Sequence, residues 1–354
     1  MIYSLKLDNF RNFVGKNLKF SEQITVILGE NGVGKTNILE SLFLLSTGKS
    51  FKARTEMEMI RYDQELARIS GTVASSMEQV ASEDKNYILP TTKLEVVLTE
   101  GVNGWPKKRL LINSVPKRII DFSGIFKTVL FGPWDMDLVT ESPSVRRKFL
   151  DSVLSQVDRE YRRSILSYEQ GLRQRNRLLF RIREEGIARS QLLFWNQLLI
   201  KNGDYISKMR EEFIEYVNIQ PGINKQKLEI TYDKSAISEA RLEQYAREEV
   251  ASATTLVGPH RDDFIFIADG RELAKYGSRG QQRMSILWLK LAELNYIEKL
   301  TGERPTLLLD DIFSELDHAH RDIVMEVTTK QQTIITTADE HFLEKNVEFS
   351  TIKL

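Results

Sequence analysis

The sequence predicts an α/β protein in which a sheet-based head is interrupted by a helical lobe. The β-branched run at residues 24–28 is typical of a buried strand, and a glycine-rich turn and a helix over about 36–45 follow it. Between residues 143 and about 209 the apolar residues fall at helical intervals, and strand character returns at 306–309. The predicted segments are one part of the head at residues 1–130, a helical lobe at 131–249 and the second part of the head at 250–354.

Shorter elements complete this pattern. Apolar runs at 94–98 and 109–112 flank a turn at 101–104, which predicts antiparallel strands within about 66–120. Ser142 and Pro143 are typical of a helix start, with serine as the cap and proline in the first turn. Further along, the sequence predicts strands at 228–232, 264–267 and 333–336 and helices at about 281–300 and 318–330.

Composition is ordinary for a globular protein and excludes several classes. Apolar residues make up 41% of the 354 and charged residues 28%. Because cysteine is absent, no disulfide scaffold and no thiolate metal site are expected. Apolar runs such as 42–45 and 307–309 are far shorter than the roughly 20 residues of a membrane helix. The first residues lack a secretory signal, so we expect a cytoplasmic protein with no membrane partner.

Residues 29–36 read Gly-Glu-Asn-Gly-Val-Gly-Lys-Thr and match the phosphate-loop pattern G-x-x-x-x-G-K-[ST], between a predicted strand and a predicted helix. Glycines let backbone N–H groups turn toward phosphate oxygens, and the helix N-terminus favours negative charge. We expect Lys35 to reach the β- and γ-phosphates of ATP as a catalytic residue, and Thr36 to ligate Mg²⁺. Against the alternative of an ordinary glycine-rich turn, the pattern predicts nucleotide contacts at Gly29, Glu30, Asn31, Gly32, Val33, Gly34, Lys35, Thr36 and Asn37.

Residues 305–311 form an apolar strand that ends in two carboxylates. In a protein with a phosphate loop, this pattern places Asp310 in the shell of Mg²⁺. Asp311 is then the catalytic residue that orients or deprotonates a water. The alternative, a buried strand followed by an acidic turn, is disfavoured beside the phosphate loop. A Ser-Glu-Leu-Asp sequence follows at 314–317.

A second anion-binding turn is predicted at the start of the helix near residue 280. Free N–H groups and the helix dipole favour an anion at such a start, and the predicted nucleotide contacts there are Ser278, Gly280 and Gln281. A serine cap on an ordinary helix explains the same residues. Two phosphate-binding turns in one chain suggest a nucleotide held between two copies of the protein.

Five further segments are distinctive: 5–13, 133–139, 142–151, the Gly-Pro-His-Arg-Asp-Asp run at 258–263, and 308–317. With the phosphate loop they resemble ABC-type ATPase heads and, within them, the RecF family, over nearly the whole chain. The resemblance implies an ABC-type ATPase head with a mixed core sheet, an antiparallel β subdomain, an inserted helical lobe and no long coiled coil. Within the first segment, Arg11 and Asn12 fit nucleotide contacts and turn positions equally.

The resemblance also implies a function: a DNA-binding ATPase that dimerises with ATP in recombinational repair and replication restart. It implies slow, DNA-stimulated hydrolysis, double-stranded DNA and gapped or single-stranded junctions as ligands, and RecR and RecO as partners. Three residues in the segment near 133–143 depart from the family pattern: Trp134, Met136 and Glu141. Thr336-Thr337-Ala338 stands where transporter-type heads carry a switch histidine; His341 is a weak substitute and receives no catalytic role.

Basic residues concentrate in segment 144–183, although the chain as a whole is neutral with 50 basic and 50 acidic residues. The segment holds eleven basic and four acidic residues, a net charge of +7. Such arrays bind nucleic-acid phosphates with little sequence preference. A solvated helix face is the alternative. The residues expected to contact DNA are Arg146, Arg147, Arg173, Arg175 and Arg177.

Three rival functions fit parts of the pattern. A P-loop kinase acting on a small molecule needs neither the Ser278 turn nor the loop at 314–317. A structural head of SMC type would carry a long coiled coil. Such a coiled coil is excluded here, because only 243 positions separate Lys35 from Ser278 and sustained heptads are lacking. A transporter motor is disfavoured by the RecF-like segment at 133–151. The leading hypothesis is therefore a nucleotide-gated DNA-binding protein.

Overall fold

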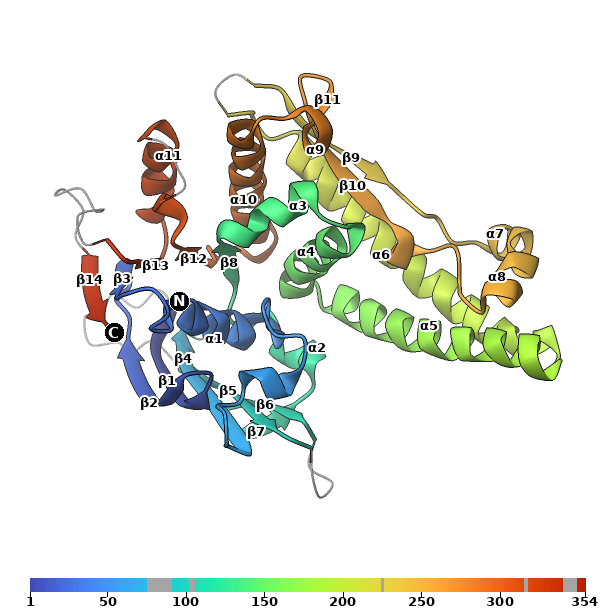
Figure 1. Cartoon of the computed structure of the whole chain (residues 1–354), viewed down its shortest axis with the longest axis horizontal. Coiled ribbons are helices and arrows are strands. Elements are labelled where there is room, and N and C mark those ends of the chain that lie inside the picture. The colour runs from blue at the N-terminus through green and yellow to red at the C-terminus, as the bar shows by residue number, and fades with distance from the viewer. Residues whose placement is uncertain (75–90, 102–105, 224–225, 315–317, 340–348) are drawn as a thin grey trace. The chain divides into compact units, whose positions relative to one another are not determined.

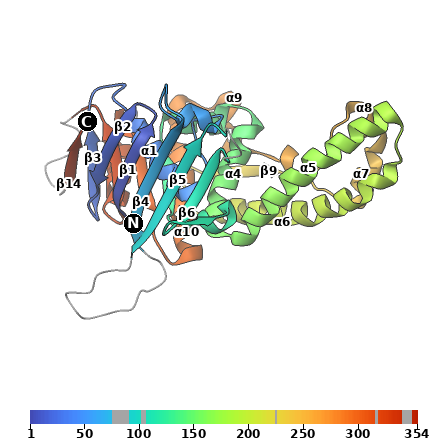
Figure 2. The same cartoon turned by 90° about the horizontal axis from the view of Figure 1, so that it is seen from below.

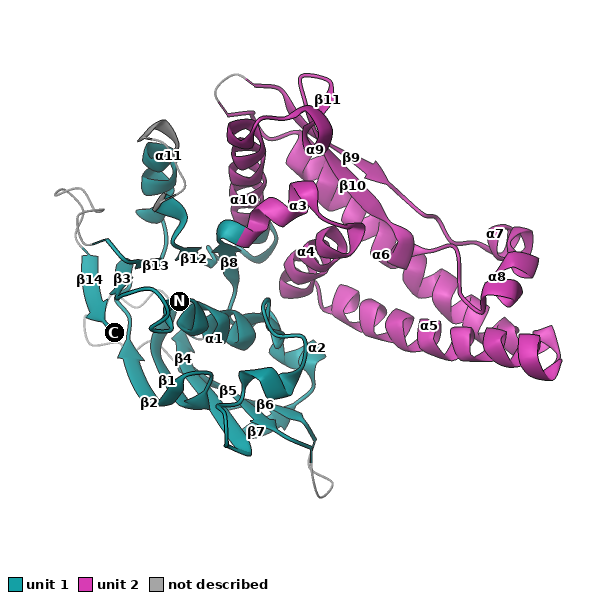
Figure 3. Cartoon of the chain, in the orientation of Figure 1, with its two compact units in different colours: residues 1–133, 297–354 teal, residues 134–296 magenta. Residues whose placement is uncertain are grey.

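The computed structural model describes residues 1–74, 91–101, 106–223, 226–314, 318–339 and 349–354 (Figure 1). The chain divides into two compact units, coloured separately in Figure 3. Unit 1 comprises Met1–Pro133 and Ile297–Leu354, and unit 2 comprises Trp134–Tyr296. Unit 2 is thus inserted into the chain of unit 1, as expected for a head interrupted by a lobe.

A five-stranded parallel sheet forms the centre of unit 1. Its inner strands are buried along their whole length, which suits parallel strands covered on both faces. The carboxyl ends of parallel strands meet at one edge, and the register sets Asp310 beside Thr336 there. In spatial order the strands are β14 (Phe349–Lys353), β3 (Ile24–Leu28), β13 (Thr333–Thr337), β12 (Thr306–Asp310) and β8 (Thr128–Phe131).

A six-stranded antiparallel sheet is the second layer of unit 1, and Figure 2 shows several of its strands side by side. Helix α1 (Lys35–Thr47) contacts strands of both sheets, and its leucines and isoleucine are buried. The predicted antiparallel β region is therefore confirmed; part of its 101–104 turn lies outside the described residues. The strand order is β2 (Phe13–Lys19), β1 (Ile2–Phe10), β4 (Leu66–Ala74), β5 (Thr91–Thr99), β6 (Lys108–Ile112) and β7 (Val115–Lys117). Unit 1 also contains the short helices η1 (Glu56–Met59) and α2 (Ile119–Phe122), the turn η5 (Ile312–Ser314), and α11 (His318–Thr328).

Unit 2 is built around two long helices, α5 (Arg159–Glu185) and α6 (Leu193–Asn218), which pack side by side. Asp158 caps α5 by accepting hydrogen bonds from two N–H groups of its first turn, and Gly186 ends it in the left-handed conformation. The remaining helices are η2 (Pro133–Met136), α3 (Asp137–Thr140), α4 (Pro143–Val157), η3 (Arg189–Leu192), α7 (Glu239–Gln244), α8 (Ala246–Ser252), η4 (Pro259–Arg261), α9 (Leu273–Tyr276) and α10 (Arg279–Thr301). Strands β9 (Leu228–Asp233), β10 (Asp263–Ala268) and β11 (Arg271–Glu272) form a small antiparallel sheet.

Because of this small sheet, the second boundary between the units lies later in the chain than the predicted end of the helical lobe at residue 249. The sequence assigned residues 250–354 to the head, whereas the compact unit runs on to Tyr296. Strand β10 pairs antiparallel with β9 along its whole length, so it is joined by backbone hydrogen bonds to the helical part of the chain. Pairing between strands that are distant in sequence leaves no local signal, which is why the boundary was placed earlier.

A buried ionic network holds the centre of unit 2 together. Arg210 of α6 donates hydrogen bonds to the carboxylates of Asp151 and Asp262, both at 2.9 Å, and to the carbonyl of Pro259 at 2.7 Å. Asp262 also accepts hydrogen bonds from the Tyr232 hydroxyl and from the N–H of Ser235. Removing one member of such a network leaves a buried charge without its partner, so the network fixes the arrangement of α4, α6 and β9.

His260 lies beside this network as a neutral, hydrogen-bonded residue. Its Nδ1 accepts a hydrogen bond from the Tyr168 hydroxyl at 2.8 Å, and its Nε2 lies 3.0 Å from the carbonyl of Thr255. The carbonyl can only accept, so Nε2 carries the proton. Burial lowers the pKa of His260 to about 4, with smaller contributions from Arg261 and Arg147. The hydrogen bond to the Thr255 carbonyl and, to a lesser extent, Asp262 oppose this shift only in part. The folded protein therefore resists protonation of this ring.

We expect acid to destabilise unit 2 through His260. The pKa of His260 is below its ordinary value of 6.5, so its contribution is complete above pH 6.5 and is lost as the pH falls toward 4. The loss should be about 3 kcal/mol of unfolding free energy between these limits. Urea unfolding followed by tryptophan fluorescence measures it, since Trp134, Trp195 and Trp288 lie in unit 2. The His260→Asn variant should lose this part of the pH dependence, and an unchanged profile would contradict the assignment.

Candidate nucleotide site and arginine face

The predicted phosphate loop connects β3 to α1 in unit 1. Gly32 and Gly34 have positive φ angles of 85° and 111°, and a Cβ on Gly34 would come within 2.7 Å of the Asn12 side chain. Only glycine fits this position. The buried Lys35 ammonium donates to the carbonyls of Gly29 at 2.6 Å and Glu30 at 3.0 Å, so it is held over the loop that it belongs to.

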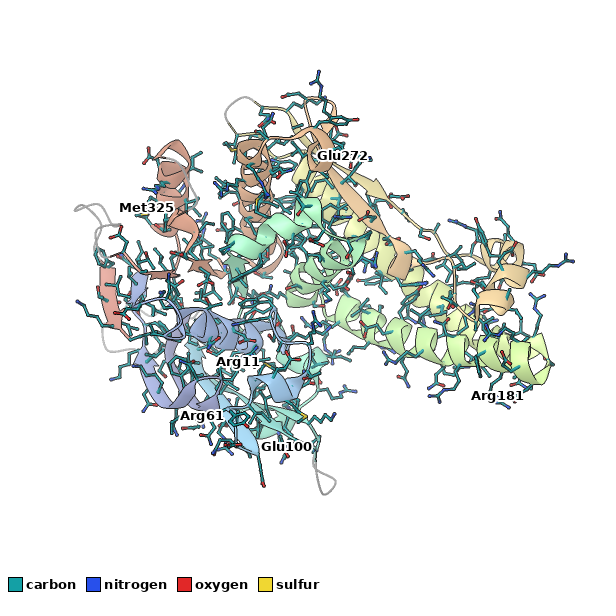
Figure 4. The ribbon with its side chains drawn as sticks, in the orientation of Figure 1. Arg11, Arg61, Glu100, Arg181, Glu272 and Met325 are labelled. Atoms are coloured by element: carbon teal, nitrogen blue, oxygen red, sulfur yellow. The ribbon has the colours of Figure 1, made fainter. Side chains whose placement is uncertain are left out.

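The turn between β1 and β2 supports this loop. Asn12 donates to the carbonyl of Val33 at 2.8 Å and accepts from the Asn37 amide at 2.9 Å. Arg11, labelled in Figure 4, makes two hydrogen bonds of 2.8 and 2.6 Å to the fully buried Glu40 of α1. These contacts give Arg11 and Asn12 a supporting role beside the loop. The sequence did not single out Glu40, because its partner is 29 positions away.

Asp310 is a buried carboxylate at the end of β12. It accepts hydrogen bonds from the hydroxyl of Thr36, at 2.7 Å, and from that of Thr336, at 2.6 Å. Among the described residues, no Lys, Arg or His forms an ion pair with it. Buried charges are normally paired or bound to a metal, so an Asp beside a Thr hydroxyl fits a divalent cation that takes its other ligands from phosphates and water. Over the same part of the chain, no cluster of three or more His, Asp or Glu offers a protein-only metal site.

Asp311 directly follows and adopts a left-handed backbone, with φ of 47°. Its N–H donates to the carbonyl of Thr336 at 3.1 Å, which anchors the turn after β12 to the end of β13. The predicted roles of Asp310 as a magnesium ligand and of Asp311 as the base stay predictions. Of the loop at 314–317, residues 315–317 lie outside the described part of the chain, as does His341.

The Ser278 turn forms a capping box at the start of α10. The Gln281 N–H donates to the Ser278 hydroxyl at 3.3 Å, and the Ser278 N–H donates to the Gln281 side chain at 2.9 Å. Ser278 and Gly280 are exposed, and a Cβ on Gly280 would meet only the Ser278 hydroxyl, at 4.0 Å. The turn belongs to unit 2, whereas the phosphate loop belongs to unit 1.

The structure corrects part of the predicted DNA-contact set. Arg175 is 2% exposed and donates to Glu249 at 2.6 Å, to Thr255 and to Asn196. The buried Arg146 makes two hydrogen bonds to Asp263, and Arg147 donates to the carbonyl of Asp262. Arg175 and Arg146 therefore stabilise unit 2 and are not available to DNA. Periodicity did not reveal this, because buried arginines with distant carboxylate partners look the same in sequence as solvated ones.

Five exposed arginines define what we call the arginine face of α5: Arg159, Arg163, Arg173, Arg177 and Arg181. Their spacings of four or ten positions place them within one side of a helix, over a length of about 33 Å. Arg163 and Arg181 pair with Glu160 and Glu185, and Arg181 is labelled in Figure 4 toward the far end of α5. The side chains of Arg173 and Arg177 make no hydrogen bond or ion pair with any described residue.

Fold and site together define the class of protein: a phosphate-loop ATPase head of the ABC and SMC type. The model of the RecF/RecN/SMC N terminal domain matches residues 1–354. The chain belongs to the RecF family of DNA replication and repair proteins, as the sequence resemblance predicted. A "DNA replication and repair protein RecF" from Lachnoclostridium phytofermentans is 34% identical over 99% of this chain and 97% of its own length. One from Herpetosiphon aurantiacus is 36% identical over 95% of this chain and 92% of its own.

Solved structures agree with this assignment. The structure of a RecF bound to ATPrS, titled as a recombination mediator of the RecFOR pathway, has a TM-score of 0.87 at 32% identity. It matches 100% of this chain and 96% of its own; a RecF–ATP structure has a TM-score of 0.85 at 33% identity. An SMC head bound to part of ScpA has a TM-score of 0.50 at 15% identity and supports the fold alone. No helix in the described part of the chain has the length and apolarity that a membrane span needs.

Proposed function

We propose that this chain binds ATP with Mg²⁺ and acts as an ATP-dependent dimer on DNA during recombinational repair and replication restart. The observation that carries the proposal is the phosphate loop beside a buried carboxylate, Asp310, that lacks a cationic partner among the described residues. The RecF–ATP structures of the RecFOR pathway support the same ligand and the same process. The relatives come from bacteria, and a protein acting on the chromosome there works in the cytoplasm.

Each residue of the site then has a role. Residues 29–37 surround the phosphates with backbone N–H groups, and Lys35 contributes positive charge at the β- and γ-phosphates. Thr36 and Asp310 would hold Mg²⁺, which would neutralise phosphate charge. Asp311 orients the attacking water. Its side chain is one methylene shorter than a glutamate, so proton abstraction is poorly positioned and hydrolysis is slow, acting as a reset.

The dimer follows from the second anion-binding turn. Ser278, Gly280 and Gln281 lie at the start of the 23-residue helix α10, where the helix dipole favours an anion such as a γ-phosphate. A small-molecule kinase has no use for such a turn. We therefore place it against the ATP of a second copy of the chain, so that each nucleotide is held by two protomers.

DNA is assigned to the arginine face of α5. Five exposed arginines over about 33 Å match the length of roughly one turn of duplex, about 34 Å. Guanidinium groups on a helix surface bind backbone phosphates without reading sequence. We infer that duplex next to a gap or a single-stranded junction is the ligand, that bound DNA stimulates hydrolysis, and that RecR and RecO are the protein partners, since the relatives belong to the RecFOR pathway.

The nucleotide assignment is tested with Lys35→Ala. Losing one charge-assisted contact should weaken binding of a fluorescent ATP analogue about 10- to 100-fold without unfolding the protein. ATP-dependent dimerisation, measured by sedimentation, should disappear as well. Lys49→Ala, which removes an exposed lysine after the same helix, is the control. If Lys35→Ala binds ATP and dimerises like the parent, the assignment fails.

The shared site is tested with Ser278→Arg. A bulky cation at the start of α10 should block ATP-driven dimerisation and leave ATP binding by the monomer nearly normal. Mixing this variant with Lys35→Ala protein should restore part of the association, because a mixed dimer has one site with both defects and one with neither. Loss of ATP binding in the monomer, or dimerisation that persists in Ser278→Arg alone, would rule out the two-protomer site.

The arginine face is tested by the pair Arg173→Gln and Arg177→Gln. The double variant should bind unrelated DNA sequences more weakly by a similar factor. The slope of log affinity against log salt should become shallower by about 2, since each phosphate contact contributes about 0.9. The matched control is Lys201→Gln with Lys208→Gln, two exposed lysines on α6 that change net charge equally. Equal effects of the two pairs would show that only overall charge matters.

A further inference from the structure

Thr336 lies near the end of β13. It is completely buried, and the parallel register pairs it with Asp310 of β12. Its hydroxyl donates to Asp310 Oδ1 at 2.6 Å, whereas Thr36 donates to Oδ2 at 2.7 Å. The two threonines therefore hold the two oxygens of one carboxylate from opposite sides.

The same threonine also holds the next residue. The N–H of Asp311 lies 3.1 Å from the carbonyl of Thr336 and 3.2 Å from its hydroxyl oxygen. The hydroxyl can donate its single proton to Asp310 while it accepts this N–H. One side chain thus links the carboxylate predicted to bind Mg²⁺ with the backbone of the residue predicted to act on water. Asp311 adopts a left-handed conformation, which is held by these contacts.

We propose that Thr336 is a positioning residue that sets the orientation of the Asp310 carboxylate for Mg²⁺ and fixes the turn that carries Asp311. Groups that hydrogen-bond a metal ligand orient it and affect metal affinity although they never touch the metal. The inference rests on the proposed ATP–Mg²⁺ site.

A simpler role would be that of a buried threonine whose hydroxyl needs a partner. The neighbouring Thr337 is a matched control, because it is also buried and lies on the same strand, but its hydroxyl oxygen accepts the N–H of Asp339. Thr336→Val and Thr337→Val both remove a buried hydroxyl and keep the side-chain shape. Only the first removes a donor to Asp310.

The experiment titrates Mg²⁺ against the full-length protein with a fluorescent ATP analogue. In Thr336→Val the Mg²⁺ concentration at half-saturation should rise about tenfold, with analogue binding in the absence of Mg²⁺ unchanged. Thr336→Ser, which keeps the hydroxyl, should return it to the parent value, and Thr337→Val should not change it. If the valine variant does not fold, Thr336→Cys replaces the hydroxyl with a weaker thiol donor and should show a smaller shift in the same direction.

The unfolding free energy without ligands separates the two roles. A purely structural threonine would lower stability and leave the Mg²⁺ midpoint at the parent value, and that result in Thr336→Val or Thr336→Cys would overturn the proposal. An equal shift in Thr337→Val would overturn it too. If the parent protein itself binds no ATP analogue, the proposed function fails first, and that outcome is distinct from both.

Discussion

The candidate nucleotide site of unit 1 is organised around one buried carboxylate, that of Asp310. A carboxylate in this environment is costly unless hydrogen bonds or a cation compensate it. Two threonine hydroxyls, one from α1 and one from β13, supply the hydrogen bonds. Because α1 begins directly at the phosphate loop, this single residue ties the loop, β12 and β13 into one arrangement. The cation that completes the compensation is the one we propose to arrive with ATP.

The sequence predicted those parts of the fold that have local signals. The inner strands β3, β12 and β13 are continuous apolar runs, and helix α4 begins at a serine followed by proline, so each was found near its observed position. The phosphate-loop pattern likewise lies between a strand and a helix as predicted. Pattern is sufficient in these places because the physical cause, burial of a strand or capping of a helix, acts within a few residues.

Interactions between distant residues were not predictable in this way. Thr336 has the same appearance in sequence as any strand threonine, and its link to Asp310 comes from the parallel register of two strands. Arg175 seemed to belong to a basic surface, but its partner Glu249 is 74 positions away and draws it into the interior. Counting charges therefore overstated the surface charge of segment 144–183. The helical spacing of the exposed arginines identifies the arginine face of α5.

If that face binds DNA as we propose, it gives a physical reason why ATP and DNA binding would be coupled in a chain with no net charge. In the DNA interface that we propose, the arginine face of one protomer offers at most five phosphate contacts, and two of these arginines are already paired with glutamates. Affinity falls with salt in proportion to the number of contacts, so a single face binds weakly at physiological salt. When two faces engage the same DNA, the second binding event becomes intramolecular and avidity rises without any new kind of contact. An ATP-dependent dimer would therefore hold DNA while its nucleotide lasts, and slow hydrolysis at a short carboxylate would set how long that is.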